Sequence, residues 1–172
     1  GKGGHGALPH QTIDPIVAGS QFVNALQTVV SREVNPLEPA VLSVTTFQAG
    51  TTSNVIPASA HLSGTARTFS PTLREAYPGI LERVARGVGE TSRAKIRTEY
   101  HFGPPPAIND AACVDTGRRA CGTVFGKDHL VDWELQMGGE DFAKYKNPKA
   151  LLLLGGGFAD ASRRYPQHSP HY

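Results

Sequence analysis

The spacing of apolar residues predicts a helix near the start of the chain. Asp14 precedes Pro15; aspartate is a favoured helix cap, and proline suits the first helical position because its missing N–H would be unpaired there anyway. Helical spacing continues to Val30, and Pro36 then ends the segment. The apolar positions that follow this period are Ile16, Phe22, Val23, Leu26, Val29 and Val30.

Two strands are predicted after this helix. The segment 41–47 is rich in β-branched and aromatic residues, and a loop at 50–57 separates it from an alternating segment at 60–69. Alternation with a period of two predicts a half-buried strand, because successive side chains point to opposite faces of a sheet. The side chains expected on one face are His61, Ser63, Thr65 and Arg67, and those expected on the other are Ala60, Leu62, Gly64 and Ala66.

A second helix and a third strand follow. Ser70 and Pro71 begin an amphipathic helical pattern, and Pro78 inside it is expected to kink or split the helix, because proline removes one backbone hydrogen bond. The segment 94–102 has the clearest alternation in the chain and predicts a strand. The helix presents Leu73, Tyr77, Leu81, Val84 and Val88 on its apolar face.

The predicted order of helix, strand, strand, helix and strand indicates an α+β fold. One additional strand in front gives the βαββαβ order of the ferredoxin-like split unit, and that strand would have to precede Gly1. The run 103–106 (Gly-Pro-Pro-Pro) breaks the pattern, so we place a domain boundary near Ile108. Residues 1–108 are therefore expected to form a ferredoxin-like domain that lacks most of its first strand.

Residues 109–172 are expected to form a truncated α/β segment of a second domain. A helix is predicted at 110–125, a strand at 130–135, a short helix at 140–145 and a buried strand at 150–154. Helices that alternate with apolar strands are typical of a largely parallel sheet.

Composition excludes several classes of function. The chain has 172 residues and a net charge of +2, and its lysines and arginines are scattered, so the basic stripe of a nucleic-acid binder is missing. The longest apolar run, 150–154, is far too short to span a membrane, and no signal peptide is visible. Cys113 and Cys121 match no metal-finger spacing and are expected to be buried reduced thiols of a cytoplasmic protein.

Four side chains are candidates for chemistry. His5 lies in a glycine-rich turn where the backbone can approach a ligand, and His168 follows a predicted strand and a glycine-rich loop. Asn54 in a loop and Arg67 among small neighbours can together bind a carboxylate, since guanidinium binds it in a bidentate manner. Each has an ordinary alternative: a surface histidine, a turn residue or a solvated arginine.

Two further groups are weaker candidates. The spacing of His5 and His10 has no metal signature. Glu140 and Asp141 could be metal ligands, but acidic residues at the start of a helix more often interact with its dipole.

In combination, five short motifs resemble one family, the two-metal aminoacylases and carboxypeptidases, in its N-acyl-amino-acid amidohydrolase branch (hippurate hydrolase and indole-acetyl-amino-acid hydrolase types). The motifs follow the family's order along essentially the whole chain. They are Gly-Lys-Gly-Gly-His5-Gly-Ala with Pro-His10, Gly50-Thr-Thr-Ser-Asn54-Val-Ile-Pro57, Gly64-Thr-Ala-Arg67-Thr-Phe69, Gly138-Gly139-Glu140-Asp141-Phe142 and His168-Ser169-Pro170.

The resemblance implies an α/β metal-dependent domain with an inserted ferredoxin-like lid, or dimerisation, domain. Family members hydrolyse an amide to release an amino acid and a carboxylic acid, using two divalent ions (Zn, Mn, Ni or Co) and a glutamate base. By resemblance, His5 stabilises the oxyanion in the neighbouring subunit's site. Asn54 and Arg67 would hold the carboxylate of the N-acyl amino acid. His168 would be the last metal ligand.

The resemblance also implies a homodimer formed through the lid. The segment 41–47 is its expected edge strand, because an edge strand carries unpaired N–H groups. The amino-terminal catalytic half that supplies the other metal ligands and the paired glutamates is not found in this sequence. We therefore expect the 172-residue chain alone to be an inactive fragment that cannot hold both ions.

Two other functions compete with the amidohydrolase fragment. One is a non-catalytic dimerisation module that keeps Asn54 and Arg67 as a pocket for an amino-acid carboxylate. The other, a small RNA-binding split βαβ domain, is disfavoured because it needs exposed aromatic residues and a basic face on its strands. The strand residues His61, Ser63 and Thr65 supply neither.

Overall fold

The computed structural model describes residues 1–158, 160–165 and 169–170 and contains two compact units. The first unit comprises Gly1–Pro106 with Glu134–Glu140, and the second comprises Ala107–Trp133 with Asp141–Tyr172. Within the described ranges no helix is long and apolar enough to cross a membrane.

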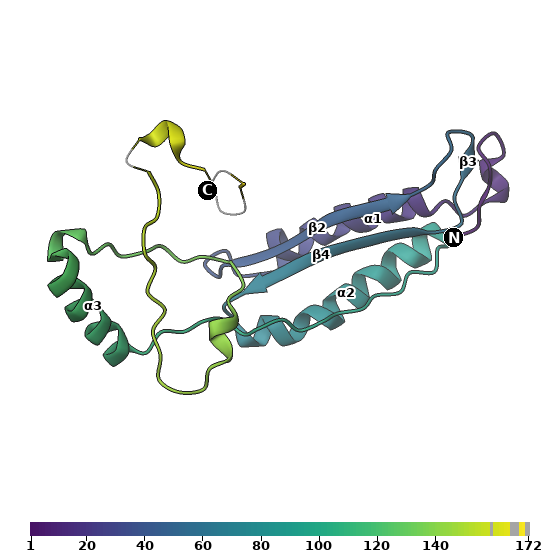
Figure 1. Ribbon diagram of the computed structural model, residues 1–172. Coiled ribbons are helices and arrows are strands. Elements are labelled where there is room, and N and C mark those ends of the chain that lie inside the picture. Colours follow the sequence, from purple (N-terminus) through teal and green to yellow (C-terminus); the bar gives the residue numbers. More distant parts are fainter. Residues whose placement is uncertain (159, 166–168, 171–172) are drawn as a thin grey trace. The chain divides into compact units, whose positions relative to one another are not determined.

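The first unit is built on an antiparallel pair of long strands, β2 (Ala40–Ala49) and β4 (Ala60–Thr68), seen side by side in Figure 1. Ala40 lies opposite Thr68 and Ala49 lies opposite Ala60, with one irregularity between Val44 and Thr46. Both predicted strands are confirmed. An inserted residue of this kind is a β-bulge, which bends the strand and increases its twist.

Two helices pack against each other and against this pair of strands: α1 (Pro15–Thr28), which continues into a π-helical turn at Val29–Glu33, and α2 (Pro71–Ser92). Their predicted starts are confirmed, because the Asp14 carboxylate accepts hydrogen bonds from backbone N–H groups of α1 and the Ser70 hydroxyl accepts one from α2. The core residues of this unit are Ala18, Leu26, Val29, Tyr77, Ala85 and Val88.

Of the two effects predicted for Pro78, a kink or a split, the split does not occur, because α2 continues through this proline. A proline inside a helix costs about 3 kcal/mol, because one hydrogen bond is lost and the ring crowds the preceding turn. The buried side chains of Tyr77, Ala85 and Val88 lie on either side of the proline. Packing of this apolar face offsets the local cost.

A second, short pairing holds the amino-terminal turn. β1 (Gly4–His5) pairs antiparallel with β3 (Val55–Ile56), and a single bridge joins Lys2 to Ile13. A one-turn helix at Pro9–Gln11 follows. This pairing was not predicted from the sequence, because neither segment is long enough to show a period.

The segment 94–102 was predicted to be a strand and is not one, although its predicted side-chain alternation is correct as far as residue 101. Phe102, predicted to share a face with Tyr100, is 48% exposed. Lys95, Arg97, Glu99 and His101 are exposed, and Ala94, Ile96, Thr98 and Tyr100 are half-buried. In the split βαββαβ order the last strand pairs only with the first, and no described strand lies beside residues 94–102. The described strands form two two-stranded sheets, so the unit is mixed α and β, and a four-stranded ferredoxin-like sheet is not confirmed.

The second unit contains the predicted helix 110–125, observed as α3 (Ala111–Phe125). Asp110 caps it, since its Oδ1 atom accepts a hydrogen bond from the Cys113 N–H at 3.0 Å, and this bond lowers the pKa of the Asp110 carboxyl. The other helical elements are one-turn helices at Lys127–His129, Asp141–Lys144 and Ala161–Arg163. Cys113 and Cys121 are free thiols and half-buried, where the sequence predicted burial.

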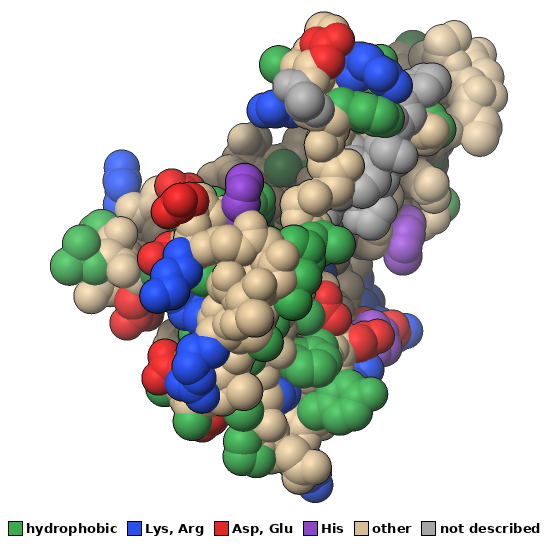
Figure 2. Space-filling model, turned by 60° about the vertical axis from the view of Figure 1, so that its left-hand side comes forward, with side chains coloured by type: hydrophobic (Ala, Val, Ile, Leu, Met, Phe, Trp, Pro, Cys, Tyr) green, Lys and Arg blue, Asp and Glu red, His purple; other side chains and the backbone are tan. Residues whose placement is uncertain are grey.

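The predicted strands 130–135 and 150–154 are wrong, since neither segment has strand structure. Most of their apolar side chains lie open to solvent: Val131 is 78% exposed, Trp133 68% and Leu154 81%. Figure 2 shows apolar side chains at the surface of the face turned forward. A strand of a parallel sheet is stabilised by neighbours on both sides and by helices on both faces, which these segments lack among the described residues.

Gly64 faces the bulge on β2, and its replacement tests how tightly the two strands pack. A Cβ atom there would collide with the backbone carbonyl oxygen of Ser43, whereas a Cβ at Gly79 on α2 would meet nothing within 4 Å. We expect Gly64→Ala to lower the free energy of unfolding by about 1–3 kcal/mol. Gly79→Ala should raise it by about 0.5–1 kcal/mol, because alanine favours the helix. Urea unfolding followed by circular dichroism measures both, and equal effects of the two changes would contradict the close backbone contact.

Candidate functional site

His5 and Asn54 lie together at one end of the first unit. His5 is opposite Val55 in the β1–β3 pair, and the Gly6 N–H donates a hydrogen bond to the Asn54 carbonyl oxygen at 2.8 Å. Both side chains are exposed. The short strand pair therefore brings together two of the residues that the sequence singled out.

The glycines of this turn serve the strand pairing. A Cβ atom on Gly3 would lie 2.9 Å from the Ile56 carbonyl oxygen, and one on Gly6 would lie 3.1 Å from the Asn54 carbonyl oxygen. Contacts this short leave no room for a larger side chain. The sequence predicted that glycine allows a close backbone approach to a ligand, and in the structure the approached group is the backbone around β3.

The hydrogen bonding of His5 fixes which ring nitrogen carries the proton in the neutral imidazole. The Ala7 N–H donates to Nδ1 of His5 at 3.0 Å, so Nδ1 uses its lone pair as an acceptor. In a neutral histidine the other nitrogen, Nε2, then carries the hydrogen. The exposed His5 side chain thus offers a hydrogen-bond donor to solvent or to a ligand.

Arg67 lies near the carboxyl end of β4, opposite Val41. Its side chain is exposed, and its Nη1 atom donates only to the adjacent Ala66 carbonyl oxygen at 3.4 Å. No carboxylate in the described part of the chain pairs with the guanidinium. A free, exposed guanidinium of this kind is available to bind a carboxylate through two parallel hydrogen bonds.

The candidate residues occupy opposite ends of the long strands. Asn54 precedes β3 near the amino end of β4, whereas Arg67 is the last residue but one of β4. The 9 residues of β4 extend over roughly 27 Å at the usual rise of a strand. One chain therefore does not bring Asn54 and Arg67 together on a single carboxylate, and their roles in binding stay predictions.

A buried tyrosine lies behind Arg67, and sequence reasoning placed it only on the apolar face of a helix. The Tyr77 hydroxyl lies 3.4 Å from the Arg67 carbonyl oxygen and 3.5 Å from the Val41 carbonyl oxygen. Burial, with a smaller contribution from Tyr100, raises the pKa of the Tyr77 phenol. The sequence offered one clue to this contact. Tyr77 lies on an apolar helix face, and a buried tyrosine hydroxyl normally finds a hydrogen-bond partner.

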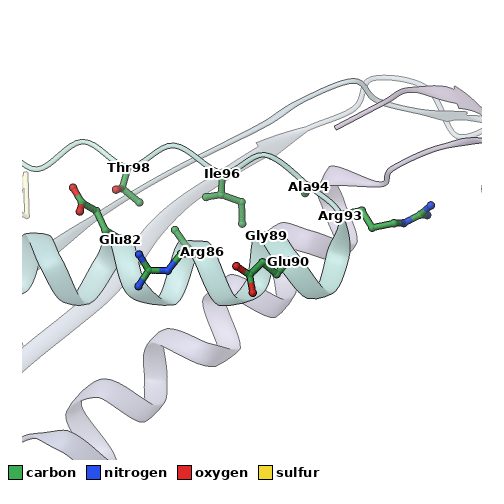
Figure 3. A pocket seen from close by; sticks show the side chains of 9 residues that line it. Glu82, Arg86, Gly89, Glu90, Arg93, Ala94, Ile96 and Thr98 are labelled. Carbon is green, nitrogen blue, oxygen red and sulfur yellow. The ribbon is translucent and has the colours of Figure 1, made fainter.

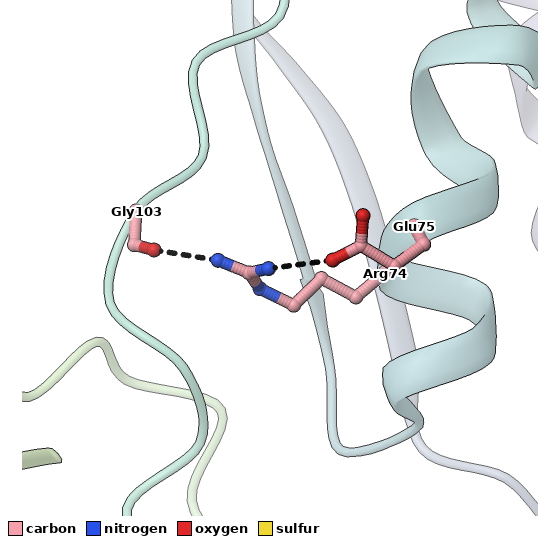
Figure 4. Close-up of polar contacts among 3 residues, drawn as sticks. All are labelled: Arg74, Glu75 and Gly103. Carbon is pink, nitrogen blue, oxygen red and sulfur yellow. Dashed lines mark hydrogen bonds and ion pairs between the residues drawn. The ribbon is translucent and has the colours of Figure 1, made fainter.

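Arg74 attaches the extended segment 94–103 to the start of α2. Figure 4 shows that its guanidinium donates to the Gly103 carbonyl oxygen at 2.8 Å and pairs with the Glu75 carboxylate at 3.0 Å. The same group lies 4.7 Å from the centre of the Phe102 ring. These contacts of the Arg74 side chain hold the end of the segment, beside which no described strand lies.

A hollow of about 450 Å³ lies between α2 and the extended segment. Figure 3 shows Ile96 pointing toward the helix between charged side chains of α2. Both signs of charge line the hollow, with Glu82 and Glu90 alternating with Arg86 and Arg93. None of the predicted site residues lines it, so it is not part of the candidate site.

The described residues do not supply a metal centre. They contain no group of three or more His, Cys, Asp or Glu side chains that could hold an ion. His168, the predicted last ligand, lies outside the described residues. Asp141 pairs with Lys144 at 2.9 Å, and His10 is exposed in its one-turn helix. The donors present do not fit two ions, so no catalytic step through a metal follows from these residues.

Comparison with known proteins identifies the family. The model of the peptidase dimerisation domain matches residues 1–86. The chain is 52% identical over 109 residues to an N-acyl-L-amino acid amidohydrolase from Geobacillus stearothermophilus, covering 63% of this chain and 30% of that protein. It is 41% identical over 159 residues to the N-acetyl-L-cysteine deacetylase of Bacillus subtilis, covering 92% of this chain and 36% of that protein.

A solved structure agrees with these relatives. The crystal structure of a dinuclear metal binding peptidase of the M20 family from Bacillus subtilis is similar with a TM-score of 0.61 and 35% identity, covering 78% of this chain and 34% of that one. The chain thus spans less than half the length of these relatives. Because the family model covers half of its residues, the chain belongs to the M20 peptidase dimerisation domain family.

Proposed function

We propose that the chain is the dimerisation and substrate-contacting part of a metal-dependent amidohydrolase that releases an amino acid and a carboxylic acid from a hippurate-like N-acyl amino acid. The observation that carries the proposal is the exposed Arg67 guanidinium, which no described carboxylate neutralises. Relatives named as N-acyl-L-amino acid amidohydrolase and deacetylase support the substrate class.

The long strands explain how two distant groups can act on one substrate. β2 pairs with β4 along one edge, and its other edge has no partner among the described strands. In a two-fold symmetric dimer, the free edge of β2 in one chain can pair antiparallel with the same edge of β2 in the other chain. That pairing places the carboxyl end of β4 in one chain beside the β1–β3 end of its partner. Arg67 then lies near the partner's His5 and the partner's Asn54.

Each side chain has a distinct task in this shared site. Arg67 binds the substrate carboxylate in a bidentate manner, and the partner's Asn54 donates its amide to the same carboxylate or to the neighbouring carbonyl. The partner's His5 offers its Nε2–H to the oxyanion that forms when the amide is attacked, since a preorganised donor stabilises developing charge.

The metal ions belong to the rest of the enzyme. A solved relative is described as dinuclear, which supports two divalent ions for the family. The choice among Zn, Mn, Ni and Co and the role of His168 as a ligand are proposals. The ferredoxin-like lid is likewise a proposal, with one more strand seated between β4 and the extended segment 94–102.

Replacing Arg67 tests the carboxylate site directly. We expect Arg67→Ala to weaken binding of hippurate by roughly ten-fold or more, because a charge-assisted hydrogen bond is lost at each oxygen. Isothermal titration without metal, at a concentration where the chain is dimeric, measures the affinity. Arg86→Ala removes another exposed arginine as the matched control and should leave it unchanged. Weaker binding by Arg67→Ala than by wild type supports the carboxylate site, which the amidohydrolase part and the binding module share, and equal binding by the two proteins contradicts this site.

Mixing two variants tests whether the site is shared between chains. Asn54→Ala and Arg67→Ala should each lose hippurate binding. In an equal mixture that exchanges subunits freely, half of the dimers carry one of each, and each mixed dimer has one intact site of two. We therefore expect about a quarter of the wild-type number of sites, as two-fold symmetry requires. Recovery of no sites in a mixture that has formed mixed dimers would contradict sharing, and sedimentation as a monomer only would contradict the dimer.

A further inference from the structure

We infer that Tyr77 is a positioning residue for Arg67, because its buried hydroxyl holds the end of the strand from which the guanidinium projects. This inference rests on the proposed role of Arg67 in binding the substrate carboxylate. Tyr77 itself does not touch the substrate, since its side chain is 0% exposed.

The contact is made at the register position of Arg67. Tyr77 lies in α2, and its hydroxyl is 3.4 Å from the carbonyl oxygen of Arg67 and 3.5 Å from that of Val41. Val41 and Arg67 are opposite each other in the β2–β4 pair. A hydroxyl has one hydrogen, so it donates to one of these oxygens at a time. This contact therefore joins α2 to both β2 and β4 at one position.

The Tyr77 ring is itself held in place. Tyr100 stacks on it with ring centres 6.4 Å apart, and Phe102 meets Tyr100 edge-on at 5.0 Å. Arg74 covers Phe102 and donates to the Gly103 carbonyl oxygen. Aromatic pairs of this kind are directional and contribute beyond simple burial. The hydroxyl of Tyr77 therefore has little freedom to leave the carbonyl oxygens.

Arg67 needs such support because of where it lies. The strand β4 ends at Thr68, and the ends of elements open more readily than their centres. No described carboxylate or distant backbone group holds the guanidinium, so its direction depends on the backbone that carries it. Bidentate binding requires the planar guanidinium to face both carboxylate oxygens, and a turn of the backbone at the base of this long side chain would spoil that alignment.

The ionisation of Tyr77 agrees with a donor role. Burial raises the pKa of its phenol above the ordinary value of 10.0, so the hydroxyl keeps its hydrogen at neutral pH. Because the pKa is raised in the folded state, the associated stability is fully present below pH 10 and is lost as the pH rises through the raised pKa.

The test compares Tyr77→Phe with wild type in binding hippurate and its methyl ester. Removing the hydroxyl should weaken binding of the acid about five-fold and leave binding of the ester unchanged, since one hydrogen bond is lost and only the acid needs the aligned guanidinium. The matched control is Val29→Ala, which removes methyl groups from a fully buried residue of the π-helical turn and lowers stability away from Arg67. It should leave the ratio of the two affinities unchanged.

The possible outcomes separate this inference from the proposed function. If Arg67→Ala binds hippurate as tightly as wild type does, the proposed carboxylate site itself is contradicted. Strong loss in Arg67→Ala together with an unchanged acid-to-ester ratio in Tyr77→Phe overturns only the positioning role. If Tyr77→Phe does not fold, the Tyr77 hydroxyl proton is followed by NMR in wild type. A shift of its resonance when hippurate binds, but not when the ester binds, supports the inference, and no shift with either ligand overturns it.

Discussion

The length of the β2–β4 pair is the constraint on which the candidate site depends. A strand advances by a fixed rise per residue, so the 9 residues of β4 keep its two ends roughly 27 Å apart. His5 and Asn54 are tied to one end by the β1–β3 pairing, and Arg67 is near the other end. An N-acyl amino acid is far shorter than this distance. A second chain, paired antiparallel at the free edge of β2, is the simplest way to bring both groups to one substrate.

The same two strands also determine what the helices can do. At the bulge, Gly64 allows the backbones to approach more closely than any side chain would permit, and at the end of β4 the buried Tyr77 hydroxyl joins α2 to both strands. The helices therefore have two functions. Their apolar faces supply the core, and one polar atom on α2 contacts the backbone that carries Arg67. A buried polar group whose hydrogen bonds are all formed favours one packing arrangement over others.

Local signals in the sequence predicted the helix starts in both units and the strands β2 and β4, which pair with each other, whereas the strands predicted without a described partner are not formed. Asp14, Ser70 and Asp110 each accept a hydrogen bond from a residue two or three positions away, so the helix starts could be predicted from adjacent residues. A strand needs a neighbour to exist as a strand, so the pattern at 94–102 gave the correct alternation as far as residue 101 without the pairing. The segments 130–135 and 150–154 form no strand and expose most of their apolar side chains, contrary to the prediction. Likewise the motifs led to the prediction of Asn54 and Arg67 as site residues, but no pattern along the chain measures the distance between them.

A site divided between two ends of a strand pair has a thermodynamic consequence. In a single chain Arg67 can bind a carboxylate, but His5 and Asn54 lie at the far end and contribute nothing to that complex. In the proposed dimer all three contact one ligand, so the ligand binds the dimer more tightly than the monomer. By linkage, substrate then stabilises the dimer by the same factor by which dimerisation strengthens substrate binding. In the proposed dimer, the joining of two chains and the recognition of the substrate are therefore coupled. The strand β4, whose length separates Arg67 from Asn54, pairs with β2, and the free edge of β2 would pair with the partner chain.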